Sequence, residues 1–191
     1  MTLRPSSFPP RPNNLYETEP WATEALLRHV DISDKTIWEP AAGRHKMARV
    51  LARRALHVIT SDIVHYEVRH DHIFDFLQQD DHEMMLRPDG IITNPPYGPQ
   101  NRDAVRFCEL ALQRTHGIVA MLMTAKFDSG STRSHLLRDN PRFRAKIVLV
   151  DRIQWFPGSY GGTEDHAWFV WGPQSPFPSP PILRYEGKAT A

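Results

Sequence analysis

The sequence has little cysteine, almost no net charge and no long apolar run, and each of these absences excludes a class of protein. It has 191 residues and one cysteine, Cys108, so no disulfide can form within the chain. Lysine and arginine number 23 against 22 aspartate and glutamate residues, and the net charge of +1 gives no overall attraction to phosphate or to an anionic membrane. The longest apolar run, 118–123, falls far below the ~20 residues that cross a bilayer. We therefore expect a cytoplasmic protein without a membrane partner.

Length and proline distribution predict the domain organisation. A chain of 191 residues with 40% hydrophobic content can build one compact core and is short for two. Prolines cluster at the two ends, with four before residue 15 and five in 173–181. Because proline has no backbone donor and resists helix and sheet, we expect one domain over 15–172 and irregular ends at 1–14 and 173–191.

Short apolar runs alternate with longer amphipathic stretches between these ends. This alternation is typical of a doubly wound α/β fold with a mostly parallel sheet. The predicted strands are 36–39, 58–62, 73–77, 90–93, 117–123, 145–150 and 166–171, and the predicted helices are 20–30, 46–55, 101–115 and 131–138.

The most informative segment is an apolar strand that runs into a stiff polar turn, Ile-Ile-Thr-Asn-Pro-Pro-Tyr-Gly at 91–98. Ligands of open parallel sheets sit beyond the carboxyl ends of strands, so Asn94 and Tyr97 are expected to face a crevice. Pro95 and Pro96 fix φ and remove two donors, which leaves the Pro95 carbonyl free to accept a hydrogen bond beside the Asn94 oxygen. The turn thus predicts two converging acceptors.

Paired acceptors suit one kind of substrate, an amino group whose lone pair is delocalised into a ring or a carbonyl. Hydrogen bonds taken from both of its N–H groups favour a more pyramidal nitrogen, and a fixed pose aims its lone pair at an electrophile. Tyr97 is suited to stacking on a planar substrate. The structural alternative is a plain proline turn in which Asn94 caps the strand end.

The string Asn94, Pro95, Pro96, Tyr97 resembles the signature of the amino-methyltransferases, which include DNA adenine N6 methyltransferases and release-factor glutamine methyltransferases. Segments 16–23 and 166–171 are similar to small phage-type adenine enzymes. The resemblance implies a Rossmann-like class I methyltransferase fold with an antiparallel terminal strand, S-adenosylmethionine as cofactor and no metal. It also implies direct in-line methyl transfer to the N6 amine of adenine in DNA, with RNA as a further nucleic-acid partner and a protein partner for target specificity left open.

The cofactor contacts are predicted at the ends of the first strands. Residues 38–43, Trp-Glu-Pro-Ala-Ala-Gly, resemble the family's cofactor loop, and Asp62, about 20 residues later, is placed to accept the ribose hydroxyls. Thr18 has two interpretations, a contact to the methionine end and a helix cap. The full predicted set is Thr18, Glu39, Ala41, Gly43, Asp62, Asp75 and Phe76, in which Asp75 takes the adenine amine and Phe76 covers the ring.

Other segments were weighed for contact with substrate or metal. Lys126, Phe127 and Asp128 lie in a segment similar to one in the small phage-like enzymes and are predicted to wall the substrate crevice, with an ordinary loop as the alternative. The basic stretch 133–146 either meets phosphates or forms a solvated face. The glycine loop 158–162 is interpreted as a hairpin with some substrate role. Four histidines cluster with acidic residues between the predicted strands and are interpreted as surface histidines rather than metal ligands: His65, His70, His72 and His82.

One residue departs from the family pattern. The family loop usually carries a second glycine two positions after the first, where this chain has His45. A β-carbon and imidazole there crowd the cofactor or force a different turn. This departure keeps open a catalytically degenerate methyltransferase fold that serves as a binding subunit. A protein glutamine-amide methyltransferase is the second alternative, because an amide nitrogen poses the same electronic problem as the adenine amine.

Overall fold

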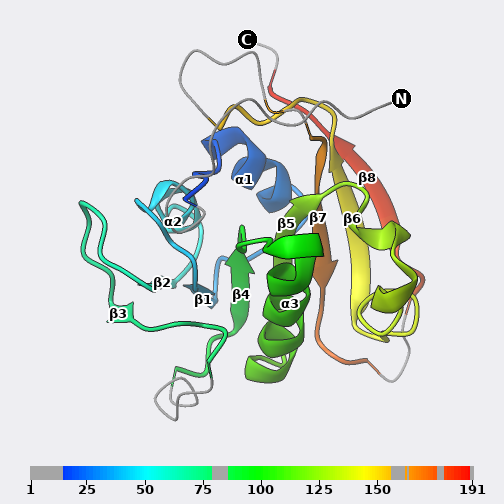
Figure 1. Cartoon of the computed structure of the whole chain (residues 1–191), viewed down its shortest axis with the longest axis horizontal. Helices are drawn as coiled ribbons and strands as arrows, with labels where there is room; N and C mark the ends of the chain where they lie inside the picture. Colours follow the sequence, from blue (N-terminus) through cyan, green and yellow to red (C-terminus); the bar gives the residue numbers. More distant parts are fainter. Residues whose placement is uncertain (1–14, 79–85, 156–161, 163, 176–178, 190–191) are drawn as a thin grey trace.

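The computed structural model describes residues 15–78, 86–155, 162, 164–175 and 179–189. Within them one eight-stranded sheet has the order β3-β2-β1-β4-β5-β7-β6-β8 (Figure 1). The strands β3, β2, β1, β4 and β5 run parallel, and β7 is antiparallel to both of its neighbours. The predicted doubly wound, mostly parallel sheet with an antiparallel strand near its end is confirmed.

The sequence ranges of the elements agree closely with the predicted ones for the central strands. The strands are β1 Thr36–Glu39, β2 His57–Asp62, β3 His72–Ile73, β4 Gly90–Thr93, β5 Ile118–Thr124, β6 Phe143–Leu149, β7 His166–Trp171 and β8 Ile182–Glu186. The helices are α1 Pro20–Leu27, α2 Lys46–Leu51 and α3 Arg102–Arg114, and the 3-10 turns are η3 Pro99–Asn101, η4 Phe127–Ser129 and η5 Ser131–Arg133.

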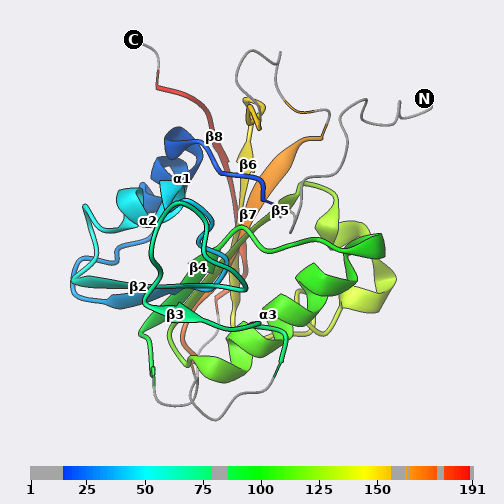
Figure 2. The same cartoon turned by 60° about the vertical axis from the view of Figure 1, so that its left-hand side comes forward.

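Helices cover both faces of the sheet, as Figure 2 shows with α1 and α2 on one side and α3 on the other. Alternating residues of one strand feed the two cores: Ile91 of β4 packs in the cluster that includes α3, and Ile92 packs in the cluster that includes α1 and α2. Both side chains are fully buried. This two-sided burial explains why the central strands are continuous apolar runs rather than alternating ones.

Two predicted elements differ from the structure because local hydrogen bonds end or replace them. The strand predicted at 73–77 stops at Ile73, since the Asp75 carboxylate accepts the Leu77 N–H at 2.9 Å and bends the chain. The helix predicted at 131–138 is a series of tight turns, with the Arg133 N–H bonded to the Gly130 carbonyl three residues back.

The carboxyl end of the chain was predicted to be irregular over 173–191, and this is wrong for β8. Residues 182–186 pair in parallel with β6, from Ala145↔Ile182 to Leu149↔Glu186. The prolines lie before the strand, where they cost no ladder hydrogen bond. The predicted irregular arm at 1–14 lies outside the described residues.

Candidate active site

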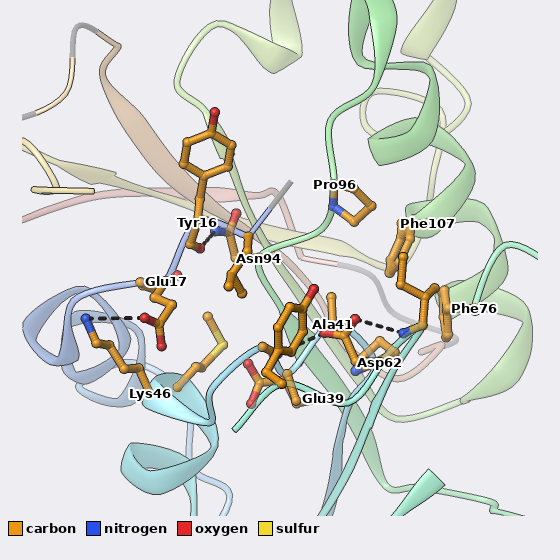
Figure 3. A pocket seen from close by; sticks show the side chains of 18 of the residues that line it. Tyr16, Glu17, Glu39, Ala41, Lys46, Asp62, Phe76, Asn94, Pro96 and Phe107 are labelled. Atoms are coloured by element: carbon orange, nitrogen blue, oxygen red, sulfur yellow. Dashed lines mark hydrogen bonds and ion pairs between the residues drawn. The ribbon is translucent and has the colours of Figure 1, made fainter. Parts of the chain in front are cut away.

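A cavity of about 220 Å³ opens where the carboxyl ends of β1, β2 and β4 meet the segment that precedes α1 (Figure 3). Residues far apart in sequence come together there, from Tyr16 and Glu39 to Asn94 and Phe107. Of the predicted cofactor residues, the cavity is lined by Thr18, Glu39, Ala41, Gly43, Asp62, Asp75 and Phe76, which is the complete set.

The turn after β1 is held to the end of β2 by a carboxylate. Asp62 accepts the Gly43 N–H at 2.9 Å through one oxygen and the Ile63 N–H at 2.8 Å through the other. Gly43 has φ +49°, and a β-carbon there meets the Leu15 side chain at 2.8 Å, so this position favours glycine. Each oxygen of Asp62 keeps capacity for a further donor, as a pair of hydroxyls would require.

Glu39, the last residue of β1, is an acid enclosed at the cavity wall. It is 2% exposed, and its Oε2 atom has no hydrogen-bond partner among the described residues. Burial, and secondarily the nearby Asp62 carboxylate, raise the pKa of Glu39 well above its usual range. A positively charged group is the complement that this arrangement lacks.

His45 does not enter the cavity. Its backbone takes the left-handed conformation, with φ 64°, directly before α2, and its ring nitrogen Nε2 lies 2.7 Å from Nδ1 of His70. The ring is therefore drawn toward the segment before β3, and His45 is absent from the cavity lining. The ring lies outside the cavity lining and has its partner in His70, so crowding of a bound cofactor by His45 stays a prediction that this geometry does not favour.

The turn after β4 is fixed by the amino-terminal segment. The Asn94 side-chain Nδ2 donates a hydrogen bond of 3.0 Å to the Tyr16 carbonyl, and both residues line the cavity (Figure 3). Since the amide nitrogen is engaged, the Asn94 oxygen is left to receive a donor from another group. Pro96 also lines the cavity, whereas Pro95 is buried and is not part of the lining.

Tyr97 is anchored outside the cavity lining. Its hydroxyl donates to the Leu122 carbonyl at 3.3 Å, and its ring lies against His166, with centroids 6.4 Å apart and planes at 29°. Burial raises the pKa of the Tyr97 hydroxyl. Trp155 extends the group, with its ring 5.2 Å from His166 and 6.0 Å from Tyr16. The four rings thus form a row of contacts that begins at Tyr97 and ends at Tyr16, whose carbonyl binds Asn94.

Two of the predicted residues, Asp75 and Phe76, form the far wall of the cavity. Phe76 is 1% exposed and stacks on Phe107 of α3 at 4.6 Å, with the Arg114 guanidinium over its ring. The Asp75 carboxylate accepts the Leu77 N–H while still lining the cavity. An apolar ring beside a carboxylate suits a flat heteroaromatic group with an amine.

Thr18 is not a helix cap. The residue before α1 in the capping position is Glu19, which makes no side-chain cap hydrogen bond. Thr18 is 3% exposed, lines the cavity, and has an Oγ1 atom without a partner among the described residues. The capping alternative is therefore wrong, and the contact to a bound ligand stays a prediction.

Sequence reasoning missed Glu17 and Lys46, which lie on the same side of the cavity. Lys46 Nζ is 3.8 Å from a Glu17 oxygen, and the other Glu17 oxygen is buried with no partner among the described residues (Figure 3). Glu17 belongs to the segment 16–23 already singled out, but nothing in its spacing distinguishes a cavity acid from a solvated one.

Comparison with known proteins assigns the fold. No family model and no curated protein matches the sequence. Among solved structures, a class I S-adenosylmethionine-dependent methyltransferase candidate from Listeria monocytogenes matches with a TM-score of 0.58 and 13% identity over 90% of this chain and 63% of that one. A protein assigned as an RNA methyltransferase, from Pyrococcus horikoshii, matches with a TM-score of 0.57 and 17% identity over 81% of this chain and 80% of that one. The fold is that of class I methyltransferases.

A third similar structure is longer than this chain. The methyltransferase subunit of a type I restriction-modification system from Streptococcus thermophilus matches with a TM-score of 0.60 and 11% identity, over 88% of this chain. The chain spans 45% of that subunit and 63% of the Listeria protein. The similarity therefore concerns the methyltransferase fold that these structures share.

The predicted substrate wall at 126–128 lies outside the cavity lining, and a substrate contact of Lys126 and Asp128 stays a prediction. Phe127 is fully buried and packs on Phe169 at 5.5 Å, so the prediction that it contacts substrate is wrong. Asp128 accepts a hydrogen bond of 2.6 Å from Lys146, and Lys126 lies 3.1 Å from Glu164. An apolar side chain at a strand end serves the core more readily than a crevice.

Most arginines of the basic stretch 133–146 donate hydrogen bonds to backbone carbonyls of the chain. Arg142 is 9% exposed and donates to the carbonyls of Gly172, Leu112, Thr115 and Gly117. Arg133 donates to the Phe127 carbonyl. Arg144 donates to the Pro141 and Pro173 carbonyls. These three guanidinium groups thus satisfy carbonyls at the ends of other elements, whereas Arg138 is exposed and pairs with Asp139, so phosphate contact by the stretch stays a prediction.

Of the histidines predicted at the surface, His70 is buried. His70 was expected at the surface, but it is 3% exposed and bonded to His45, with His65 stacked at 6.0 Å. In the described part of the chain no group of three metal-ligating side chains has the geometry to hold an ion. His82 and most of the glycine loop 158–162 lie outside the described residues. None of the described helices is long and apolar enough to cross a membrane.

Proposed function

We propose that the chain is an S-adenosylmethionine-dependent methyltransferase that acts on the N6 amine of adenine in DNA. One observation carries the proposal: Asn94, fixed by its bond to the Tyr16 carbonyl, lines the same cavity as the Glu39, Gly43 and Asp62 end of the sheet. A ligand in this cavity therefore lies beside the side-chain oxygen that can receive a target amine.

The cavity suits the proposed cofactor in charge and in shape. Its described lining holds one base, Lys46, and five acids, Glu17, Glu39, Asp62, Asp75 and Asp103. Such a lining favours a cation, and S-adenosylmethionine carries a sulfonium and an ammonium group. The buried, unpaired oxygens of Glu17, Thr18 and Glu39 give it partners for polar groups, and Phe76 gives a flat apolar wall for an adenine ring.

In the proposed mechanism the residues of the β4 turn position the target. S-adenosylmethionine, when bound, supplies an electrophilic methyl group. The Asn94 oxygen and the Pro95 carbonyl accept hydrogen bonds from the two N–H groups of the target amine, which frees its lone pair. Fixing the nitrogen in line with the methyl group supplies the orientation. The spare proton on the methylated nitrogen then leaves to solvent.

Adenine is favoured over a glutamine amide by the aromatic border of the turn. The ring of Tyr16, a residue of the cavity lining, lies against the partly exposed Trp155 ring beside the Asn94 turn, and planar bases bind on such rings. An adenine within duplex DNA must leave the base stack to reach the cavity. DNA is favoured because one similar structure belongs to a restriction-modification system, although another is assigned to RNA.

The test is transfer of labelled methyl groups from S-adenosylmethionine to unmethylated DNA, to RNA and to a protein extract in parallel. Label is expected on adenine N6 of DNA, and Asn94→Ala is expected to abolish it. Gln100→Ala, an exposed amide a few residues beyond the turn, is the matched control and should keep activity. Label on protein alone would contradict the adenine substrate, and label on RNA alone would move the assignment from DNA to RNA.

A further inference from the structure

The buried carboxyl of Glu39 is positioned as part of the cavity wall rather than of the core. The residue ends β1 and is 2% exposed, yet it lines the cavity together with Asp62, which ends the adjacent strand β2. Its Oε2 atom has no hydrogen-bond partner among the described residues. A buried polar oxygen left in this way is costly unless something else completes it.

The charged groups around Glu39 disfavour its ionised form when nothing is bound. The Asp62 carboxylate, which carries a charge of the same sign, adds to burial in raising the pKa of Glu39. Lys46 lines the cavity from α2, but its ammonium group is directed to Glu17 at 3.8 Å. Asp75 and Asp103 add further acids to the lining. The Ala48 N–H in the first turn of α2 acts in the opposite direction and is outweighed by burial.

We infer that Glu39 holds a proton in the ligand-free cavity and releases it when the positively charged cofactor binds, so that the site recognises charge as well as the nucleoside. This inference rests on the proposed function. The carboxylic acid O–H bond breaks, the electron pair stays on the carboxylate oxygen, and the proton passes to the buffer. The carboxylate then faces the cation that enters.

The coupling fixes the direction of a pH effect. A group that is protonated in the free protein and ionised in the complex makes binding stronger as the pH rises, until Glu39 is ionised in the free protein as well. The same coupling predicts that a neutral nucleoside of the same shape binds without releasing a proton. Methylthioadenosine provides that comparison, because it keeps the adenosine and the sulfur but carries neither positive group.

Calorimetry of S-adenosylmethionine binding in phosphate and in Tris at one pH measures the proton directly. The two buffers differ in ionisation enthalpy, so the measured heat is expected to differ between them for the unaltered protein. Glu39→Gln, a neutral isostere, should lose this difference and bind about tenfold more weakly. Glu109→Gln, the same change at an acid that is not part of the cavity lining, is the matched control and should keep the difference.

Each outcome decides a separate point. Equal heats in both buffers for the unaltered protein overturn the inference and leave the proposed cofactor intact. The inference is also overturned if Glu39→Gln releases as many protons as the unaltered protein, or if methylthioadenosine releases as many as S-adenosylmethionine. Should Glu39→Gln not fold, the affinity of the unaltered protein must still rise with pH, and a flat profile overturns the inference. Absence of binding at millimolar S-adenosylmethionine contradicts the proposed function itself, and the inference with it.

Discussion

The side-chain amide of Asn94 donates its hydrogen bond to the backbone carbonyl of Tyr16, 78 residues earlier in the chain. This contact joins the turn after β4 to the segment that enters α1. It also decides which end of the amide faces the cavity, because only the nitrogen can donate. The orientation of the proposed acceptor is thus set by a backbone atom.

Replacing Asn94 with aspartate tests this relationship. The carboxylate keeps an acceptor for the target amine but sets an oxygen against the Tyr16 carbonyl, so it turns away or becomes protonated. We expect methyl transfer to fall roughly 100-fold, which is the usual scale for losing one preorganised hydrogen-bonding group. Labelled methyl transfer measures it, with cofactor affinity by calorimetry as the control. Full activity in Asn94→Asp would show that the Tyr16 contact does not orient the side chain.

Replacing His45 with glycine tests whether its imidazole stays out of the cavity. Glycine adopts φ 64° without the cost of about 1 kcal/mol that a side chain incurs, but the change removes the partner of His70. These effects oppose one another, so we expect cofactor affinity within about threefold of the unaltered protein. Calorimetric titration measures the affinity. A gain of tenfold or more would mean that the ring obstructs the cofactor.

Protonation of His166 is expected to destabilise the protein in mild acid. Burial lowers the pKa of His166 to about 4, and the ring is 4% exposed. The unfolded chain binds a proton below pH ~6.5 while the folded chain does not, so stability is lost as the pH falls from there toward 4, by roughly 3 kcal/mol. Urea unfolding at pH 7 and pH 4.5 measures the loss. His166→Gln should reduce it, and an equal loss in that variant would assign the effect to other groups.

Arg142 is expected to be essential for stability and not for chemistry. Its guanidinium group donates to four carbonyls near the amino end of β5 and the end of β7, far from the cavity. Replacing it with methionine leaves those carbonyls unpaired, and we expect a loss of roughly 3–5 kcal/mol in the free energy of unfolding. Urea titration measures it, and Arg138→Met, at an exposed arginine, is the control. A loss below 1 kcal/mol in Arg142→Met would contradict this role.

The sequence alone predicted the elements that are set by local pattern. Strands β1, β4 and β7 have the bounds expected from their apolar runs, since a proline or a glycine lies within two residues of the end of each run. The residues of the cofactor loop and of the Asn94 turn were predicted because each follows a strand directly, and the carboxyl ends of parallel strands meet at one edge of the sheet. These features depend on neighbours in sequence or on the repeating unit of the fold.

What sequence could not predict depends on distant partners. The direction of the His45 ring is set by His70, 25 residues away, and the use of Arg142 is set by carbonyls about 25 to 30 residues away. Strand β8 was missed because prolines precede it and its pairing partner β6 is more than 30 residues earlier. Phe127 was placed in the crevice because a strand-end position does not reveal which way a side chain points.

Residues of β8 and just after it contact both ends of α1, the helix that follows the Tyr16 segment of the candidate active site. Glu186, the last residue of β8, accepts hydrogen bonds of 2.7 Å from Arg28 and His29, which directly follow α1. Lys188 lies 4.0 Å from Glu19, just before that helix. Removing residues 182–189 is therefore expected to make the segment before α1 less ordered. The Tyr16 carbonyl would then no longer hold the Asn94 side chain in place, although none of the removed residues lines the cavity.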